Sequence, residues 1–136
     1  MSKKKGSRTE RELFYLFYES SWMPIRAAGS GSTPIPAPDL LVGNGKRVLA
    51  IECKAIKGTK KYFEQQQIQE LLTFAEKFGA EPWIAIKFDY KGWFFLKPEE
   101  LERTKNGIPS ISIKTAQIKA RKFHELIQES TNISLK

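Results

Sequence analysis

The chain has 136 residues, which is enough for one domain with a substantial core and too few for two. Its 40% hydrophobic and 28% charged residues are ordinary for a globular protein, and no apolar run reaches the ~20 residues that a membrane span needs. We therefore expect no membrane segment. The basic start of the chain has no apolar signal-peptide core behind it, so we predict a cytoplasmic protein.

Positive charge dominates the composition. The chain carries 23 Lys and Arg against 15 Asp and Glu, a formal net charge of +8, and such basicity is typical of proteins that bind nucleic acid. A basic protein that binds nothing specific is the alternative. The single cysteine, Cys53, excludes an internal disulfide, and the single histidine, His124, is flanked by surface-type residues. We therefore predict neither a histidine zinc site nor a histidine-activated nucleophile.

Residues 1–6 are predicted to form a flexible basic tail, and residues 7–136 a single domain. The lysines of this tail, Lys3, Lys4 and Lys5, either contact phosphates or only aid solubility. Ser7 and Glu10 have the spacing of a capping box, which predicts a helix from Ser7 to about Ser21.

Glu10 has two interpretations. On a helical wheel it falls in the middle of the apolar face, level with Phe14 and Phe17, where a carboxylate is costly unless it caps, pairs or binds metal. The capping box explains it without further function. A position at a helix end next to other acids would instead make it a third ligand of a metal site.

A strand is predicted over residues 22–28, and a Gly/Ser segment followed by prolines comes after it. The hydroxyls of Ser30 and Ser32 can bond phosphate oxygens, and the prolines restrict the backbone that leads to Asp39. A flexible connection is the alternative reading of this segment. A loop that ends at Asp39 also suits an element that grips substrate.

Residues 38–42 and 48–54 are predicted to be two antiparallel strands joined at an Asn-Gly turn. Alternation along the second strand puts Glu52 and Lys54 on one face, and pairing across the turn brings Asp39 to the same region. Two adjacent carboxylates repel unless a cation or a shared proton relieves them, and Mg²⁺ binds such oxygen ligands. A surface hairpin with a Glu–Lys ion pair is the alternative.

The rest of the chain alternates helices and strands. A helix from about Tyr62 or Phe63 to Phe78, closed by Gly79 as C-cap, carries Gln67 at the edge of its apolar stripe. This amide can form hydrogen bonds with backbone groups, or it can orient a carboxylate or an attacking water molecule. The further expected elements are strands at 82–88 and 93–96, a helical turn at 98–103, a strand at 110–114 and a helix at 116–129 capped by Thr115. The late aromatic residues can form core or an interface, and we favour core: Trp83, Trp93, Phe94 and Phe95.

Several stretches resemble the archaeal Holliday junction resolvases of the Hjc/Hje type, within the PD-(D/E)xK nuclease superfamily. The resemblance covers roughly residues 3–105 and weakens beyond them. The resembling stretches are Lys5-Gly6-Ser7 with Glu10-Arg11-Glu12-Leu13, Ile25-Arg26-Ala27-Ala28-Gly29-Ser30-Gly31-Ser32, Pro38-Asp39-Leu40-Leu41, Leu49-Ala50-Ile51-Glu52-Cys53-Lys54, and Gln67 with Phe74-Ala75 and Phe78-Gly79.

This resemblance implies an α/β fold, a restriction-endonuclease-like core with a mixed β-sheet of about five strands flanked by helices. It implies an endonuclease that resolves four-way DNA junctions by Mg²⁺-dependent hydrolysis, cutting paired strands symmetrically as a homodimer. We expect Mn²⁺ to substitute for Mg²⁺ and expect no small-molecule cofactor. The alternatives are another DNA endonuclease of the superfamily, restriction-like or repair, and a non-catalytic nucleic-acid-binding module.

The resemblance also assigns site residues. The expected catalytic residues are Glu10, Asp39, Glu52, Lys54 and Ser32, of which Glu10, Asp39 and Glu52 would bind metal. The expected DNA-binding residues are Lys3, Lys4, Lys5, Arg8, Arg11, Arg26, Ser30, Ser32 and Lys57. Gln67 is expected to support the site.

Overall fold

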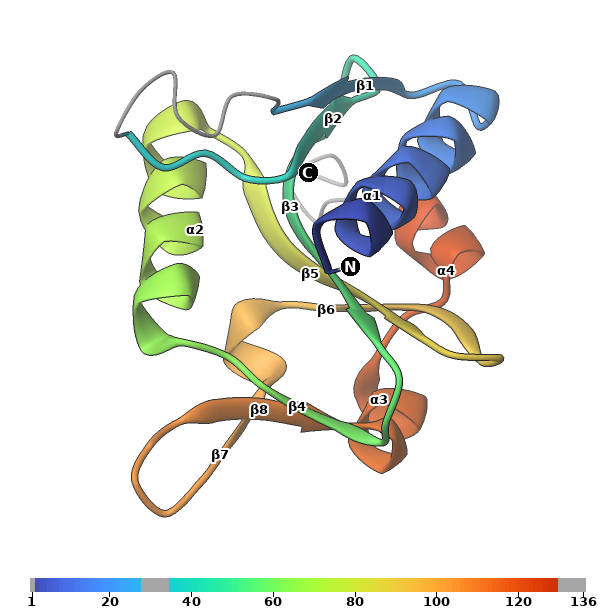
Figure 1. The fold of residues 1–136 in the computed structure, drawn as a ribbon. Helices are drawn as coiled ribbons and strands as arrows, with labels where there is room; N and C mark the ends of the chain where they lie inside the picture. Colours follow the sequence, from blue (N-terminus) through green and yellow to red (C-terminus); the bar gives the residue numbers. More distant parts are fainter. Residues whose placement is uncertain (1, 28–34, 130–136) are drawn as a thin grey trace.

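The computed structural model describes residues 2–27 and 35–129. Its elements in chain order are α1 (Ser2–Glu19), β1 (Met23–Arg26), β2 (Leu40–Gly43), β3 (Val48–Ile56), β4 (Lys60–Tyr62), α2 (Gln65–Phe78), β5 (Glu81–Phe88), β6 (Gly92–Leu96), the 3-10 helix η1 (Pro98–Glu100), β7 (Glu102–Arg103), β8 (Pro109–Ser112), α3 (Ile113–Lys119) and α4 (Phe123–Gln128) (Figure 1). Within these residues no helix is both long and apolar enough to cross a membrane.

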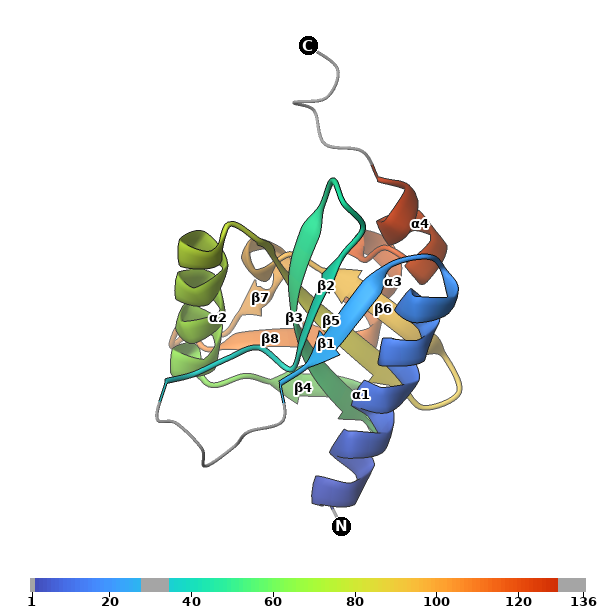
Figure 2. The same ribbon diagram turned by 90° about the horizontal axis from the view of Figure 1, so that it is seen from above.

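A five-stranded mixed sheet organises the fold, in the order β1-β2-β3-β5-β6. β3 and β5 are parallel, and every other neighbouring pair is antiparallel. Figure 2 shows α1 and α2 on opposite sides of this sheet. The α/β fold with a mixed sheet of about five strands flanked by helices, predicted from the sequence, is therefore confirmed.

Alternation along β3 divides the core into two clusters. Leu49 and Ile51 pack with Leu13 and Phe17 of α1 on one face of the sheet. Ala50 belongs to the other cluster, which the buried face of α2 joins. Glu52 and Lys54 continue the Ala50 face along β3, so the chain directs their side chains toward the α2 side of the sheet.

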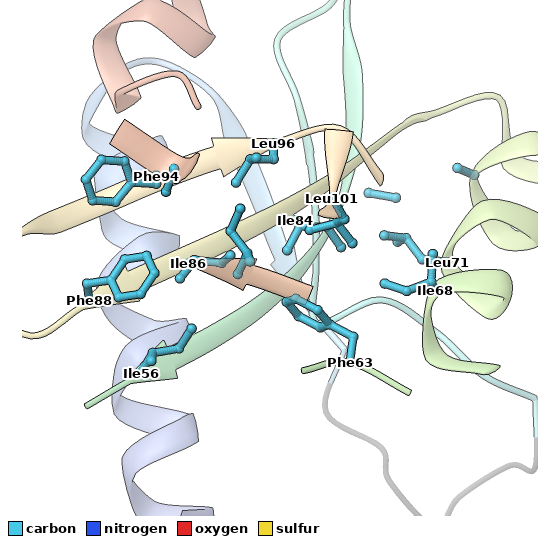
Figure 3. Packing of buried hydrophobic residues seen from close by; sticks show 14 residues of the cluster. Ile56, Phe63, Ile68, Leu71, Ile84, Ile86, Phe88, Phe94, Leu96 and Leu101 are labelled. Carbon is cyan, nitrogen blue, oxygen red and sulfur yellow. The ribbon is translucent and has the colours of Figure 1, made fainter. Parts of the chain in front are cut away.

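A second sheet of three short strands, in the order β4-β8-β7, lies at the lower end of the molecule in Figure 1. Figure 3 shows the cluster between it, α2 and the main sheet, where Phe63 and Leu101 meet Ile84 and Leu71. The aromatic residues predicted as core are indeed buried, with exposed fractions of 7% or less: Trp83, Trp93, Phe94 and Phe95.

The predicted start of the first helix is wrong. α1 begins at Ser2 rather than at Ser7, because the lysines that precede Ser7 are good helix formers and let the helix extend toward the start of the chain. The capping-box interpretation of Glu10 therefore fails, and its carboxylate accepts a hydrogen bond from Arg26 instead.

The predicted single helix at 116–129 is also wrong. The chain forms α3 and α4 with an extended break at Ala120, and Ser112 rather than Thr115 caps α3 by accepting a bond from the Thr115 amide. At the break Arg121 exchanges two backbone hydrogen bonds with Phe95, each 2.9 Å long. Pairing with β6 therefore overrides the local helix propensity.

Candidate active site

The predicted hairpin that carries the acids is confirmed. β2 and β3 are antiparallel, with Leu40 opposite Ile51, so Asp39 immediately before β2 lies next to Glu52 on β3. The turn is fixed by Asn44, whose side-chain oxygen accepts bonds from the amides of Lys46 and Arg47 at 2.9 and 2.7 Å. Local turn chemistry therefore sets the register that places the two carboxylates together.

Two side chains and one backbone amide contact the acid pair. Oδ2 of Asp39 accepts a hydrogen bond from the backbone amide of Cys53 at 2.8 Å. Nζ of Lys54 lies 3.7 Å from Oε2 of Glu52, and Nε2 of Gln67 on α2 donates a long bond of 3.4 Å to the same oxygen. One carboxylate is thus held by the backbone, and the other by an ammonium group and an amide.

A concave pocket of about 240 Å³ opens over these groups. It is lined by Pro36, Ala37, Pro38, Asp39, Glu52, Gln67, Glu70 and Leu71. The segment that leads into β2, the middle of β3 and the first two turns of α2 supply the walls. The carboxylates are half-buried and still reachable from solvent, as a site for a phosphate and a cation requires.

Both carboxyl groups have raised pKa values. Burial is the main cause of the rise in the pKa of Asp39, and the amide bond from Cys53 opposes it. Burial and then the charge of Asp39 raise the pKa of Glu52 to about 8, although Lys54 acts against the rise. The pair is therefore electrostatically unfavourable when both groups are ionised.

This donor set fits a hard divalent cation. A cation between Asp39 and Glu52 relieves the repulsion that raises both pKa values, and carboxylate oxygens are the ligands that Mg²⁺ prefers. The two groups are adjacent and face one pocket that has room for water and a phosphate. The residues present therefore fit the metal that the sequence predicted.

Glu10 is near the pair but is engaged elsewhere. Its Oε1 accepts a bond of 3.1 Å from Nη2 of Arg26, although its charge still contributes to raising the pKa values of Asp39 and Glu52. In the described ranges no three acidic, histidine or cysteine side chains are grouped so that they could hold one ion. In the described structure Glu10 is therefore not grouped with the pair as a third ligand, and its Oε1 is held by Arg26.

The expected DNA contacts are only partly described. Arg8, Arg11 and Lys57 are exposed, and Arg26 is half-buried in its pair with Glu10. Ser30 and Ser32 lie outside the described residues. The tail lysines belong to the described helix backbone, but their side chains are not described: Lys3, Lys4 and Lys5.

Two features of the pocket region were missed in the sequence. The first is Glu70, which lines the pocket together with Gln67. Residues three apart in a helix lie on one face, so the position of Glu70 near the site could have been predicted from that of Gln67. Next to it lies an apolar groove of about 480 Å³. Phe74 and Phe78 stack in this groove, with ring centroids 5.3 Å apart, and Phe78 is 55% exposed.

Comparison with known proteins decides the family. The family model described as "Archaeal holliday junction resolvase (hjc)" matches residues 1–134. The chain belongs to this family. The resemblance predicted from the sequence is thereby confirmed, and so is the endonuclease class, since the named relatives are crossover junction endodeoxyribonucleases.

The resolvase relatives match over most of their length. The "Crossover junction endodeoxyribonuclease Hjc" of Archaeoglobus fulgidus is 36% identical over 133 residues, covering 93% of this chain and 98% of the relative. The protein called "Crossover junction endodeoxyribonuclease Hje" in Saccharolobus solfataricus is 34% identical over 105 residues, covering 75% of this chain and 78% of the relative.

The fold of this resolvase family member also matches a solved structure. The solved structure of Archaeoglobus fulgidus Hjc, described as a Holliday junction resolvase from an archaeal hyperthermophile, aligns with a TM-score of 0.82 at 35% identity. The alignment covers 89% of this chain and 98% of that one. The likeness therefore spans the main sheet and its flanking helices rather than the hairpin alone.

Proposed function

We propose that this protein is a structure-selective endonuclease that resolves four-way DNA junctions by metal-dependent phosphodiester hydrolysis. The observation that carries the proposal is the Asp39–Glu52 pair, adjacent across a hairpin and facing a pocket beside Lys54. The family and its named relatives supply the reaction class. Because the proposed substrate is DNA, we also propose a cytoplasmic location.

Mg²⁺ is the proposed cofactor, with Mn²⁺ able to replace it. Asp39 and Glu52 would hold the ion, and Glu10 would join them once it is released from Arg26. A bound divalent ion at such a site neutralises charge that develops on a phosphate and lowers the pKa of bound water. The donor set consists of oxygen ligands and needs no small-molecule cofactor.

The surrounding residues have distinct proposed tasks. Lys54 lies 3.7 Å from Glu52, and its ammonium group can stabilise negative charge on the attacked phosphate. A protonated lysine beside two carboxylates is a poor general base, so we assign it an electrostatic role. Gln67 donates to Glu52 and thereby fixes the direction of that carboxylate.

Contacts to the DNA backbone would come from the basic residues near the pocket. Arg8, Arg11 and Lys57 are exposed and free to meet phosphates, and Arg26 can exchange Glu10 for a phosphate. We propose the same role for Ser30 and Ser32 and for the lysines at the start of α1, which is helical where the sequence predicted a flexible tail: Lys3, Lys4 and Lys5. Phosphate contacts carry no base information, which suits recognition of a branched shape.

We further propose a homodimer. Two strands of a four-way junction must be cut symmetrically, so two sites related by a two-fold axis are the expected arrangement. The groove around Phe74 and Phe78 adjoins the pocket through Pro36 and Glu70, which line both. It supplies an apolar surface for an isologous interface. Sedimentation analysis of wild type and Phe78→Ser tests this, and a monomeric wild type would contradict it.

Cleavage of a synthetic four-way junction, compared with linear duplex of the same sequence, tests the proposed function. Wild type with Mg²⁺ should cut the junction in preference, and Asp39→Asn should lose about a thousandfold in rate while retaining binding. Equal cutting of linear duplex would indicate a restriction-like or repair enzyme. Binding without any cleavage would leave a nucleic-acid-binding module.

A further inference from the structure

Several cations of the described chain are paired with carboxylates. Within the described chain, carboxylate partners lie within 4.0 Å of Arg26, Arg47, Lys54, Lys87 and Arg121. By contrast, no described carboxylate lies within 4.0 Å of the ammonium groups of Lys57, Lys60 and Lys61. Three free positive charges within five residues attract a polyanion.

These three lysines lie on the segment that leaves the pocket. β3 carries Lys54 at the site, ends at Ile56 and turns through residues 57–59 into β4. β4 is an edge strand of the small sheet, because β8 is its only partner there. Figures 1 and 2 together place β4 on the side of the molecule toward which the start of α1 also points.

The side chains of this edge form a small prearranged surface. Lys60 is exposed and Lys61 half-buried, and Tyr62 is 55% exposed although it is a large aromatic residue. Nζ of Lys60 lies 5.2 Å from the centre of the Tyr62 ring. Lys60 and Tyr62 therefore project from one face of the strand and present an ammonium group beside an open ring and hydroxyl.

We propose that the β4 edge, defined as Lys57, Lys60, Lys61 and Tyr62, binds the backbone of the duplex arm that flanks the cut phosphate. This inference rests on the proposed function, because Lys54 and the acid pair fix where that phosphate lies. Lys60 is six residue steps after Lys54, and six steps of extended chain span at most ~20 Å. At about 3.4 Å per base step, the contacts fall within roughly six base pairs of the cut.

Edge strands supply a competing explanation. Lysines on an exposed edge also prevent pairing with another chain, and β4 needs such protection whether or not it binds DNA. The two explanations predict different results when the lysines are neutralised. Loss of protection alone would produce self-association with unchanged DNA affinity, and loss of a DNA contact would reduce both affinity and its dependence on salt.

The first test is binding of a four-way junction by the Lys60→Ala/Lys61→Ala double variant, measured without metal between about 50 and 200 mM salt. Two lost phosphate contacts should lower the slope of log affinity against log salt by about two and weaken binding about tenfold at the low-salt end. Lys46→Ala is the matched control, an exposed lysine at the opposite end of β3, and should bind as wild type does. Thermal unfolding of each variant checks that it folds. Lys60→Gln alone should show about half of the decrease in salt slope that the double variant shows.

The second test locates the contact. Junctions that carry one neutral methylphosphonate at successive backbone positions should bind wild type more weakly within roughly six base pairs of the cut, and the double variant should lose nothing further there. Wild-type affinity and salt slope in the double variant would overturn the proposal, with or without self-association. Cleavage of junction and of linear duplex by wild type is measured separately. Loss of junction preference there would contradict the proposed function, whereas the result for the double variant tests only the β4 edge.

Discussion

Arg26 on β1 donates a hydrogen bond of 3.1 Å from Nη2 to Oε1 of Glu10 on α1. Both side chains are largely screened from solvent, with 31% and 21% of their area exposed. Among the described residues, Nε of Arg26 is a buried donor with no hydrogen-bond partner. The pair therefore holds an acid predicted to bind metal, while one nitrogen of the guanidinium stays buried without a partner, a position that costs free energy.

Replacing Arg26 by Met should separate metal binding from DNA binding. Without the guanidinium, Glu10 remains uncompensated beside Asp39 and Glu52, so Mn²⁺ should bind the DNA-free protein several-fold more tightly. DNA affinity should fall about tenfold with the loss of one charged contact. Titration calorimetry with Mn²⁺ and anisotropy with junction DNA measure the two effects. Weaker Mn²⁺ binding would show that Arg26 instead positions Glu10 for the metal.

The raised pKa of Glu52 makes the stability of the metal-free protein depend on pH. Its pKa is about 8 in the folded chain and near 4.5 when unperturbed, so the folded state binds the proton more tightly. This contribution is complete below pH 4.5 and is lost as the pH rises through 8, so the free energy of unfolding should decline over that window. Urea unfolding in EDTA measures it. Glu52→Gln should remove most of the decline, and an equal decline in that variant would exclude Glu52 as its source.

The same titration predicts how metal affinity varies with pH. Because a carboxylate must lose its proton to bind a cation, binding of the proposed Mg²⁺ below pH 8 should displace a proton from Glu52. The apparent affinity should therefore rise about tenfold per pH unit until it levels off near the pKa. Calorimetry in two buffers of different ionisation enthalpy counts the released protons. Binding at pH 6 without proton release would contradict the assigned pKa.

Gln67 should affect the rate more than binding. Its amide donates to Oε2 of Glu52 at 3.4 Å and makes no charged contact with DNA, so Gln67→Met should lower kcat about 10- to 100-fold and leave the junction Kd unchanged. Single-turnover cleavage and anisotropy give the two values. Gln65→Met is a matched control, because Gln65 is exposed at the start of α2, lines neither the pocket nor the groove, and accepts a bond from Arg103. Equal losses in both variants would indicate a general effect on α2.

The parts of the fold that could be predicted are those encoded within a few residues. The Asn44-Gly45 turn and the alternation from Leu49 to Cys53 determine the hairpin, its register and the face of Glu52. Gly79 ends α2 in the left-handed conformation that the sequence indicated, with φ of 87°. These features depend on local backbone chemistry, so the sequence alone was sufficient to predict them.

The missed elements depend on distant partners. β4 has only three residues, Lys-Lys-Tyr, without an apolar alternation, and it is a strand because it pairs with β8 about fifty positions later. The break between α3 and α4 likewise exists because Arg121 pairs with Phe95. Neither partner can be identified from a local pattern.

The site, like the fold, has features that the local sequence predicts and features that depend on distant partners. The sequence placed Asp39, Glu52 and Lys54 together, since one hairpin carries all three. It could not show that Glu10 bonds Arg26, or that burial raises the pKa of Glu52, because both depend on how α1 and the pocket walls pack. Packing between elements therefore determines the electrostatics, and the hairpin determines the chemistry.

Arg47 should be critical for stability and neutral for catalysis. Its side chain, 7% exposed, bonds both oxygens of Glu81 and the carbonyls of Leu126 and Glu129, and its guanidinium lies 5.7 Å from the Trp22 ring. Arg47→Met leaves Glu81 without its charged partner, with only the bond from the Trp83 indole, and should cost about 3–5 kcal/mol, lowering Tm by roughly 10 °C or more. Arg47→Lys keeps the charge but not the planar fork and should recover only part of this loss. Calorimetry gives Tm, and cleavage well below Tm should proceed at the wild-type rate, since Arg47 does not line the pocket. If Arg47→Lys had the wild-type Tm, the positive charge alone, rather than the several hydrogen bonds of the guanidinium, would stabilise the packing of α4 against the sheet.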